Sequence, residues 1–429
     1  MKPSNHTIRN IRALELLDVP GSVRLRVEVE LGGGLKAQST ASLSLTGSDS
    51  AQDIAGYVER VVARALRNVD VCDQERVDAS LLMLNGNERD MLLAGITRAT
   101  SVACAKLGAI INGISNFEYI ARLLSARKKL NGAHQPFTLP LPIISTFYGR
   151  QVGDTTLDFK EYCLLPVRRF GFRRSLSLRE ELRRLHTVVA KLTKLLDQKQ
   201  LGSSLSRHGG FTSALDSTIQ AFDVQLEAIR EAGLRPGDDV VLGINAGASA
   251  LFDDRMGEYR FQAEQSFLSR EQMVELFLTW LETYPIGYLQ DPLDQDDWTG
   301  LSELQLALDH RKHVVQRSDL MIGIEEALSG DIRRVQHASR VGAASCVVVP
   351  WSLMQTVTEA VNLVLVASEQ RMEVVLSRGL IDGGGDMLAD LAVGLGVDAV
   401  KFGSLVSADS IQLYNRLLEI EQQELGTRN

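Results

Sequence analysis

Short runs rich in β-branched residues recur through the second half of the chain, with amphipathic helical patterns between them. The six runs are DVVLGIN (239–245), IGYLQD (286–291), HVVQRSD (313–319), ASCVVVP (344–350), EVVLSR (373–378) and AVKFGS (399–404). Consecutive runs start about 25 to 47 residues apart. Repeated strand-then-helix units form parallel sheets, and this many units favour a closed αβ barrel, with an open doubly wound sheet as the alternative. No glycine-rich fingerprint follows any run, which weakens a nucleotide-binding version of the open sheet.

The first third of the chain follows a different pattern. Apolar residues alternate with charged ones from Val23 to Leu31, which predicts a half-buried antiparallel strand, and three glycines at 32–34 supply a hairpin turn. We interpret the Ser/Thr-rich stretch 39–50 as a mobile loop, and 54–69 has the apolar spacing of one helix face. The proline-rich LPLP at 139–142 interrupts helix. These features predict an α+β domain over 1–135 and the barrel over 136–429.

Composition limits the class of protein. The 429 residues are 45% hydrophobic with a formal net charge of −8, so the chain can bury a large core, and its acidic excess argues against nucleic-acid or anionic-membrane partners. The four cysteines, at 72, 104, 163 and 346, form no C-x-x-C pair and indicate free thiols in a reducing compartment. We find no signal-peptide pattern at the N-terminus and no apolar run near the roughly 20 residues that span a bilayer. A cytoplasmic protein is expected.

In a barrel, chemistry belongs where the strands end. The polar residues there are Glu161, Asn245, Gln290, Asp291, Ser318, Asp319, Ser377, Arg378 and Lys401, together with Pro350. A Mg²⁺ site needs two or three carboxylates, and only Glu161, Asp291 and Asp319 are available in this set. The sequence therefore predicts a barrel mouth too poor in negative oxygen to hold a divalent cation.

Several long motifs resemble the enolase family, in order and over essentially the whole chain. They are DVCDQERVD (70–78), LPLPII (139–144), DFKEYCLLPV (158–167), YPIGYLQDPLDQDDW (284–298) and VKFGSLVSADSIQLYNRLLEIEQQEL (400–425). The resemblance implies an enolase-like modified (β/α)8 barrel with an N-terminal α+β capping domain, and commonly a homodimer. It also implies the family's reaction, the reversible dehydration of 2-phosphoglycerate to phosphoenolpyruvate. There a lysine removes the proton, a glutamate assists loss of hydroxide, and two Mg²⁺ stabilise the enolate.

Carried over residue by residue, the resemblance places most of the family's functional groups on unsuited side chains. The three metal-binding carboxylates correspond to Asn245, Gln290 and Ser318, and the catalytic lysine corresponds to Pro350. The acidic pair of the Asp-Glu-Gly-Gly-Phe motif corresponds to Arg207 and His208, the histidine of the barrel loop to Val152, and the phosphate-gripping His-Arg-Ser set to Arg378, Gly379 and Leu380. Glu161 and Lys401 are retained. We therefore expect no metal ligands and no cofactor.

Three functions remain open. The leading hypothesis is an enolase-like pseudoenzyme with a binding, regulatory or assembly role. The second is a metal-independent enzyme or sensor for a small phosphorylated or carboxylated anion, with Glu161, Lys401 and His208 as catalytic groups and Arg378, Arg207, Arg150 and Lys401 as anion-binding groups. Against the second, each arginine can instead pair with a carboxylate such as Asp382 to close an empty site. The third is residual phosphopyruvate hydratase activity.

Overall fold

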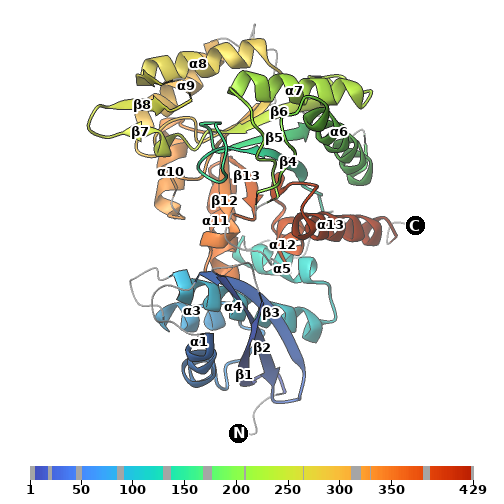
Figure 1. Ribbon diagram of the computed structural model, residues 1–429. Coiled ribbons are helices and arrows are strands. Elements are labelled where there is room, and N and C mark those ends of the chain that lie inside the picture. The colour runs from blue at the N-terminus through green and yellow to red at the C-terminus, as the bar shows by residue number, and fades with distance from the viewer. Residues whose placement is uncertain are drawn as a thin grey trace.

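The computed structural model describes residues 5–17, 22–44, 51–84, 91–128, 137–167, 176–206, 209–263, 265–310, 320–328, 330–379 and 387–426. In Figure 1 the N-terminal elements gather at one end of the molecule and a barrel with its surrounding helices occupies the other, with α5 and α11 between them. All statements about structure below concern the residues in these ranges.

The N-terminal part is a three-stranded antiparallel sheet covered by helices. Its elements are β1 (Ile8–Leu16), β2 (Ser22–Leu31), β3 (Lys36–Ser44), α1 (Ala51–Tyr57), the π-helical turn η1 (Val58–Val62), α2 (Ala63–Ala65), α3 (Gln74–Leu84), α4 (Met91–Asn112) and α5 (Asn116–Arg127). The predicted alternation in β2 is confirmed, because Leu25, Val27 and Val29 are buried beneath the helices.

Two local predictions for this part need correction. Residues 39–44 are the second half of β3 rather than a mobile loop, while 45–50 lie outside the described residues. Ala41 and Leu43 pack in the core with Ser42 buried between them, so a Ser/Thr-rich stretch can form a strand when its apolar residues pack on a core. The buried helix face predicted from Ile54 to Val69 is also wrong at Val61, whose side chain is 38% exposed. The wider π-helical turn at 58–62 rotates that residue outwards.

Eight strands close the barrel, which excludes the open-sheet alternative. In chain order they are β4 (Leu141–Tyr148), β5 (Glu161–Pro166), β6 (Val240–Asn245), β10 (Ile286–Gln290), β11 (Met321–Ile324), β12 (Cys346–Pro350), β13 (Glu373–Ser377) and β14 (Ala399–Gly403). All neighbours are parallel except that β5 runs antiparallel to both β4 and β6. The start of β5 therefore lies at the same mouth as the ends of the other strands.

The remaining elements surround the barrel. Helices α6 (Leu178–Gln198), α7 (Thr218–Glu231), α8 (Arg270–Thr283), α9 (Trp298–His310), α10 (Ile332–Val341), α11 (Val357–Glu369), α12 (Leu388–Leu395) and α13 (Ala408–Gly426) cover the strands. The short turns η2 (Ala248–Ala250) and η3 (Trp351–Leu353) follow β6 and β12, and β7 (Phe252–Asp253), β8 (Glu258–Phe261) and β9 (Ser266–Leu268) form a small separate sheet. Apolar side chains such as Ile143, Tyr288 and Val375 fill the barrel interior.

The fifth barrel strand differs from the sequence prediction. We expected HVVQRSD (313–319), which lies outside the described residues, but the position between β10 and β12 is taken by β11 at 321–324. Gln290 of β10 pairs with Gly323 of β11, and Gly323 pairs in turn with Cys346 of β12. The residues that follow Ile324 therefore reach the barrel mouth.

Polar side chains of the N-terminal part hold the barrel segment that follows β12. Asp78 Oδ2 accepts from the Thr358 backbone N–H at 2.9 Å, and Ser101 Oγ accepts from the Val357 N–H at 3.0 Å. Both donors belong to the first turn of α11, which has no intrahelical acceptors for them. Arg98 Nη1 donates to the carbonyls of Ser352 and Met354 at 2.9 and 3.0 Å. We call Gln74, Asp78, Arg98 and Ser101 the seam network.

Helix α4 contains one stretch, Leu93–Asn112, that is long and apolar enough to cross a membrane, contrary to our sequence expectation. Because 83% of that stretch is buried inside the molecule, it has the surroundings of a core helix. All four cysteines are free; Cys104, Cys163 and Cys346 are buried, and Cys72 is exposed.

Candidate functional site

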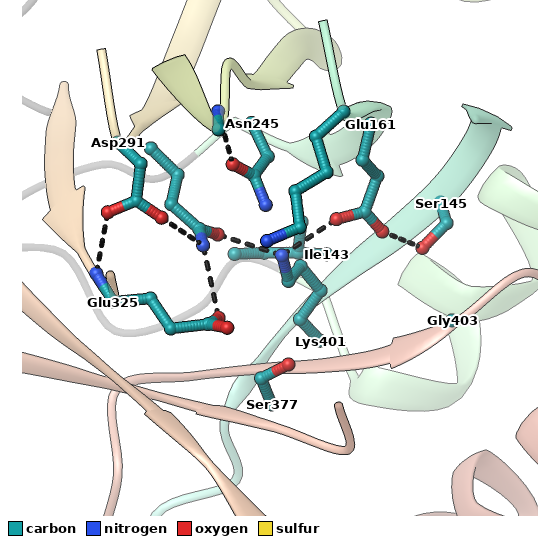
Figure 2. Close-up of polar contacts among 12 residues, drawn as sticks. Ile143, Ser145, Glu161, Asn245, Asp291, Glu325, Ser377, Lys401 and Gly403 are labelled. Carbon is teal, nitrogen blue, oxygen red and sulfur yellow. Dashed lines mark hydrogen bonds and ion pairs between the residues drawn. The ribbon is translucent and has the colours of Figure 1, made fainter. Parts of the chain in front are cut away.

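The strand ends bring a set of polar side chains to the barrel mouth. Asn245 and Gln290 end β6 and β10 and pair with each other, and Glu161 at the start of β5 pairs with Asn245 from the other side. Lys401 lies on β14, level with Ser377 at the end of β13. Figure 2 shows that these side chains converge from opposite sides of the barrel.

Lys401 lies at the centre of the contacts. Its Nζ donates to Glu161 Oε2 at 2.7 Å and to Gln290 Oε1 at 2.8 Å, and its side chain is only 6% exposed. Ser145 Oγ donates to the other Glu161 oxygen, Oε1. The Glu161 carboxylate is therefore bound on both oxygens, by an ammonium and by a hydroxyl (Figure 2).

Gln290 extends this arrangement to two more carboxylates. Its Nε2 donates to Asp291 Oδ2 at 2.9 Å and to Glu325 Oε2 at 3.1 Å, while Tyr288 OH donates to its Oε1 at 2.6 Å. The orientation of the amide follows from chemistry, because an ammonium can only donate and an ionised carboxylate can only accept. We call Glu161, Gln290, Asp291, Glu325 and Lys401 the mouth network.

The pKa shifts in this network follow from burial and pairing. Burial raises the pKa of Glu161, but the Lys401 charge and the hydrogen bonds from Lys401 and Ser145 outweigh it, so the net pKa is lowered. Burial lowers the pKa of Lys401, yet the charges of Glu161 and Glu325 raise it above its ordinary value. The two groups form a charged pair at neutral pH.

The pKa of Asp291 is shifted in the opposite direction from that of Glu161. Burial and the nearby charges of Glu326 and Glu325 raise its pKa to about 7, although the backbone N–H of Glu325 and the Gln290 amide donate to it. Its backbone lies in the left-handed region at φ 44°, a conformation that costs free energy for a residue with a Cβ. Lys160 Nζ pairs with Glu326 Oε1 at 2.9 Å beside it.

A cavity of about 170 Å³ opens at this mouth. Its lining includes Val152, Asn245, Pro350, Arg378 and Lys401. Arg378 is 7% exposed, and its Nη1 has no hydrogen-bond partner among the described residues. A buried N–H without an acceptor is costly, so this atom favours an anionic or acceptor group in the cavity.

Of the other predicted site residues, Arg150 is described and the rest lie outside the described residues. Arg150 does not line the cavity in the described part of the chain; its Nε lies 3.2 Å from Asp158 Oδ1, and Nη2 donates to the Thr156 carbonyl. Arg207, His208, Ser318, Asp319, Leu380 and Asp382 lie outside the described residues. Their predicted roles stay predictions.

Glu325 is the residue that sequence reasoning missed. It directly follows β11, so it occupies the strand-end position that we had predicted for Ser318. The signal was the acidic pair after the apolar run 320–324, which we overlooked because 313–319 looked more strand-like. Our expectation of a mouth poor in carboxylates was therefore wrong: Glu161, Asp291, Glu325 and Glu326 all gather there.

The closed eight-stranded barrel, with β5 antiparallel to both neighbours, agrees with the modified (β/α)8 barrel that the resemblance implies. The family model described as the enolase C-terminal TIM barrel domain matches residues 136–429. The chain belongs to the enolase family. That family is Mg²⁺-dependent, and its barrel domain accounts for the fold from β4 to α13. The domain division at 135/136 stays a prediction.

The residues at the mouth do not fit the family's divalent cation. Hard cations need several anionic oxygens, and the three strand-end positions carry two neutral amides and one carboxylate, Glu325. The Asn245 Oδ1 accepts from the Gly247 N–H at 3.1 Å, and Gln290 Oε1 already accepts from Lys401 and Tyr288. Gln290 Oε1 therefore has two donors within the protein, and Asn245 Oδ1 has one.

Proposed function

We propose that this enolase-family protein is a pseudoenzyme that does not dehydrate 2-phosphoglycerate and has a binding, regulatory or assembly role. The observation that carries the proposal is Pro350, which ends β12 and lines the mouth cavity at the position that corresponds to the family's catalytic lysine. Proton removal beside a carboxylate needs a base within reach of that proton, and a proline side chain has no titratable group.

The retained groups do not replace the missing base. The Lys401 ammonium is bound to Glu161 and Gln290 with a raised pKa, so at neutral pH it has no lone pair to offer. Glu161 is charged, but both its oxygens accept hydrogen bonds from Lys401 and Ser145. A general base must be free to take a proton, and neither group is.

A coupled assay with purified protein, 2-phosphoglycerate and Mg²⁺ tests this, with an active enolase as the positive control. We expect turnover at least about 10⁴-fold below the control. Glu161→Gln is the matched variant: a trace activity that it leaves unchanged comes from contamination. Turnover within about 100-fold of the control, abolished in Glu161→Gln, would refute the proposal.

A second function is favoured by Arg378, whose buried Nη1 lacks an acceptor among the described residues while the side chain lines the cavity. We propose that the cavity binds a small phosphorylated or carboxylated anion without metal. A guanidinium donates to both kinds of oxygen in fixed geometry.

Thermal unfolding in rising concentrations of inorganic phosphate or acetate tests anion binding. We expect the melting temperature of the wild type to rise, Arg378→Ala to abolish the rise, and Arg371→Ala, an exposed arginine, to leave it unchanged. Equal shifts in all three proteins would indicate a general salt effect and would remove this candidate.

We also propose that the protein acts as a cytoplasmic homodimer, as the cysteine usage and the resemblance imply. Light scattering on the purified protein measures the subunit number, and a mass of about 47 kDa, one chain, would contradict the dimer.

A further inference from the structure

Three potential metal ligands lie together in the N-terminal part of the molecule, outside the barrel. His6, Asp70 and Cys72 each offer one ligand atom, and these three atoms lie within 4.8 Å of one another. His6 and Asp70 are exposed, and Cys72 is an exposed free thiol. A metal ion can therefore reach all three side chains from solvent. We call these residues the N-terminal triad.

Backbone pairing fixes the two segments that carry the triad. The Ile8 N–H donates to the Val69 carbonyl at 2.9 Å, and the Val71 N–H donates to the His6 carbonyl at 3.1 Å. Ile8, Val69 and Val71 are buried next to the ligand positions, so they anchor both segments to the core. Asp70 is oriented further by its own turn, because its Oδ1 accepts from the Cys72 backbone N–H at 3.0 Å. The fold therefore holds the three ligands in place.

The spacing of the ligand atoms suits a tetrahedral metal. Donors about 2.0–2.3 Å from such a metal lie about 3.3–3.8 Å from one another. Separations of up to 4.8 Å reach that spacing by shifts of about 1 Å, which exposed side chains make by rotation.

The kinds of donor narrow the choice of metal. The triad combines an imidazole nitrogen, a carboxylate oxygen and a thiol sulfur. Mg²⁺ and Ca²⁺ take oxygen ligands, so a sulfur and a nitrogen donor argue against them. Zn²⁺ binds all three donor types and keeps water in its fourth position where the protein supplies only three ligands.

A buried hydroxyl near the triad lacks a partner. Tyr119 of α5 is 4% exposed, and its OH has no hydrogen-bond partner among the described residues. Burial raises the pKa of this phenol most and the charge of Cys72 raises it next, so the hydroxyl lies close to the triad. A water bound to a metal is the kind of partner that this hydroxyl lacks.

We propose that His6, Asp70 and Cys72 form a Zn²⁺ site in the N-terminal part. On binding, the Cys72 thiol releases its proton to the buffer and the thiolate sulfur bonds to the metal. The ion joins the segment before β1 to the segment before α3, the helix that begins at Gln74. None of these ligands belongs to the barrel mouth, where we expect no metal, so the inference goes beyond the proposed function.

Titration with Co²⁺ tests the site, because a bond from cobalt to a thiolate gives a charge-transfer absorption in the near ultraviolet. The protein is first treated with a chelator and kept reduced. We expect one saturable band per wild-type chain, which Zn²⁺ then removes by displacing the weaker-binding Co²⁺. A band that excess Zn²⁺ leaves unchanged would contradict a zinc site.

Three variants assign the band to the triad. Cys72→Ser should abolish it, because the hydroxyl replaces the only exposed thiol among the described residues. His6→Ala should weaken Co²⁺ binding at least about 100-fold, the upper end of the loss for removing a partner outside the ligand set. Asp70→Asn keeps the acceptor of the turn but loses the charge, and should weaken binding at least about tenfold.

His186→Ala is the matched control, because His186 is an exposed histidine on α6 and should leave binding unchanged. The inference would be overturned by a wild type without a saturable band up to about 1 mM Co²⁺. An unchanged affinity in His6→Ala, or an unchanged band in Cys72→Ser, would overturn it too. The wild-type titration decides even if a variant does not fold.

Discussion

The mouth network and the seam network each bury a carboxylate almost completely, yet the pKa of the carboxylate is shifted in opposite directions in the two networks. Glu161 in the mouth pairs with an ammonium, and its pKa is lowered despite burial. Asp78 in the seam accepts hydrogen bonds from Gln74 and the Thr358 N–H, all neutral donors, and burial raises its pKa to about 6. Neutral hydrogen bonds can therefore satisfy the lone pairs of a buried carboxylate while its charge stays uncompensated, and its pKa is then raised.

The two networks also meet on one segment. Pro350 and Ser352 line the mouth cavity, while Arg98 of the seam network holds the carbonyls of Ser352 and Met354. Asp78 and Ser101 cap the helix that follows. The N-terminal part therefore sets the position of one wall of the cavity, although it supplies none of the charged groups of the mouth network.

Lys401→Met is expected to cause the largest loss of stability in either network, because it leaves Glu161 buried without its counter-charge. We expect the free energy of unfolding, measured by urea denaturation, to fall by about 3–5 kcal/mol. Lys401→Met/Glu161→Gln should recover most of that loss because the unpaired charge is gone. A loss below about 1 kcal/mol in the single variant would mean that the pair contributes no more than a surface ion pair.

Asp78→Asn should change how stability depends on pH, which tests the raised pKa of Asp78. A raised pKa means that the folded state holds the proton more tightly, so the wild type loses stability as pH rises from about 4 to about 7. Asn cannot ionise, so the stability of the variant relative to the wild type should increase by up to about 3 kcal/mol over that range. Unfolding measured at several pH values checks this, and a difference independent of pH would contradict a buried charged Asp78.

Arg98→Ala should lower the free energy of unfolding by less, about 2 kcal/mol, because it removes the donor from two buried carbonyls. The same variant should make the backbone amides of 351–358 exchange hydrogen faster, because Arg98 no longer binds the carbonyls of Ser352 and Met354. Unchanged exchange in that segment would show that the seam network does not position the wall.

Ser145→Ala should cause the smallest loss in the free energy of unfolding, about 1 kcal/mol, because Glu161 keeps the contact with Lys401 and loses only the Ser145 hydroxyl as a donor. A lowered pKa gives stability that is present at neutral pH and lost as pH falls through the folded pKa. The variant should raise that pKa, so its acid unfolding should begin at a higher pH than in the wild type. An identical acid midpoint would argue against this hydrogen bond.

The sequence predicted the barrel because six runs rich in β-branched residues recur with amphipathic helical stretches between them. It also predicted which side chains meet at the mouth wherever a strand end carries them, as for Asn245, Gln290 and Lys401. The errors arose where local pattern and tertiary packing disagree. Residues 39–44 look like a loop but complete a sheet on α4, and 313–319 look like the fifth strand although 321–324 fills that position.

That second error changed the electrostatic argument. We had inferred a site without enough acid to hold a metal, whereas Glu325 and its neighbours make the mouth rich in carboxylates. The contacts of Lys401 with Glu161 and with Gln290 join residues more than a hundred positions apart, and Gln290 contacts Glu325 from 35 positions away. No local pattern records such pairing, so only the folded barrel reveals it.

Anomalous scattering from a crystal soaked in Mn²⁺ tests the central claim most directly. The account predicts no anomalous peak between Asn245, Gln290 and Glu325, with Lys401 Nζ still in contact with Gln290. A well-occupied Mn²⁺ bound by oxygens of these three residues, with Lys401 displaced, would contradict it.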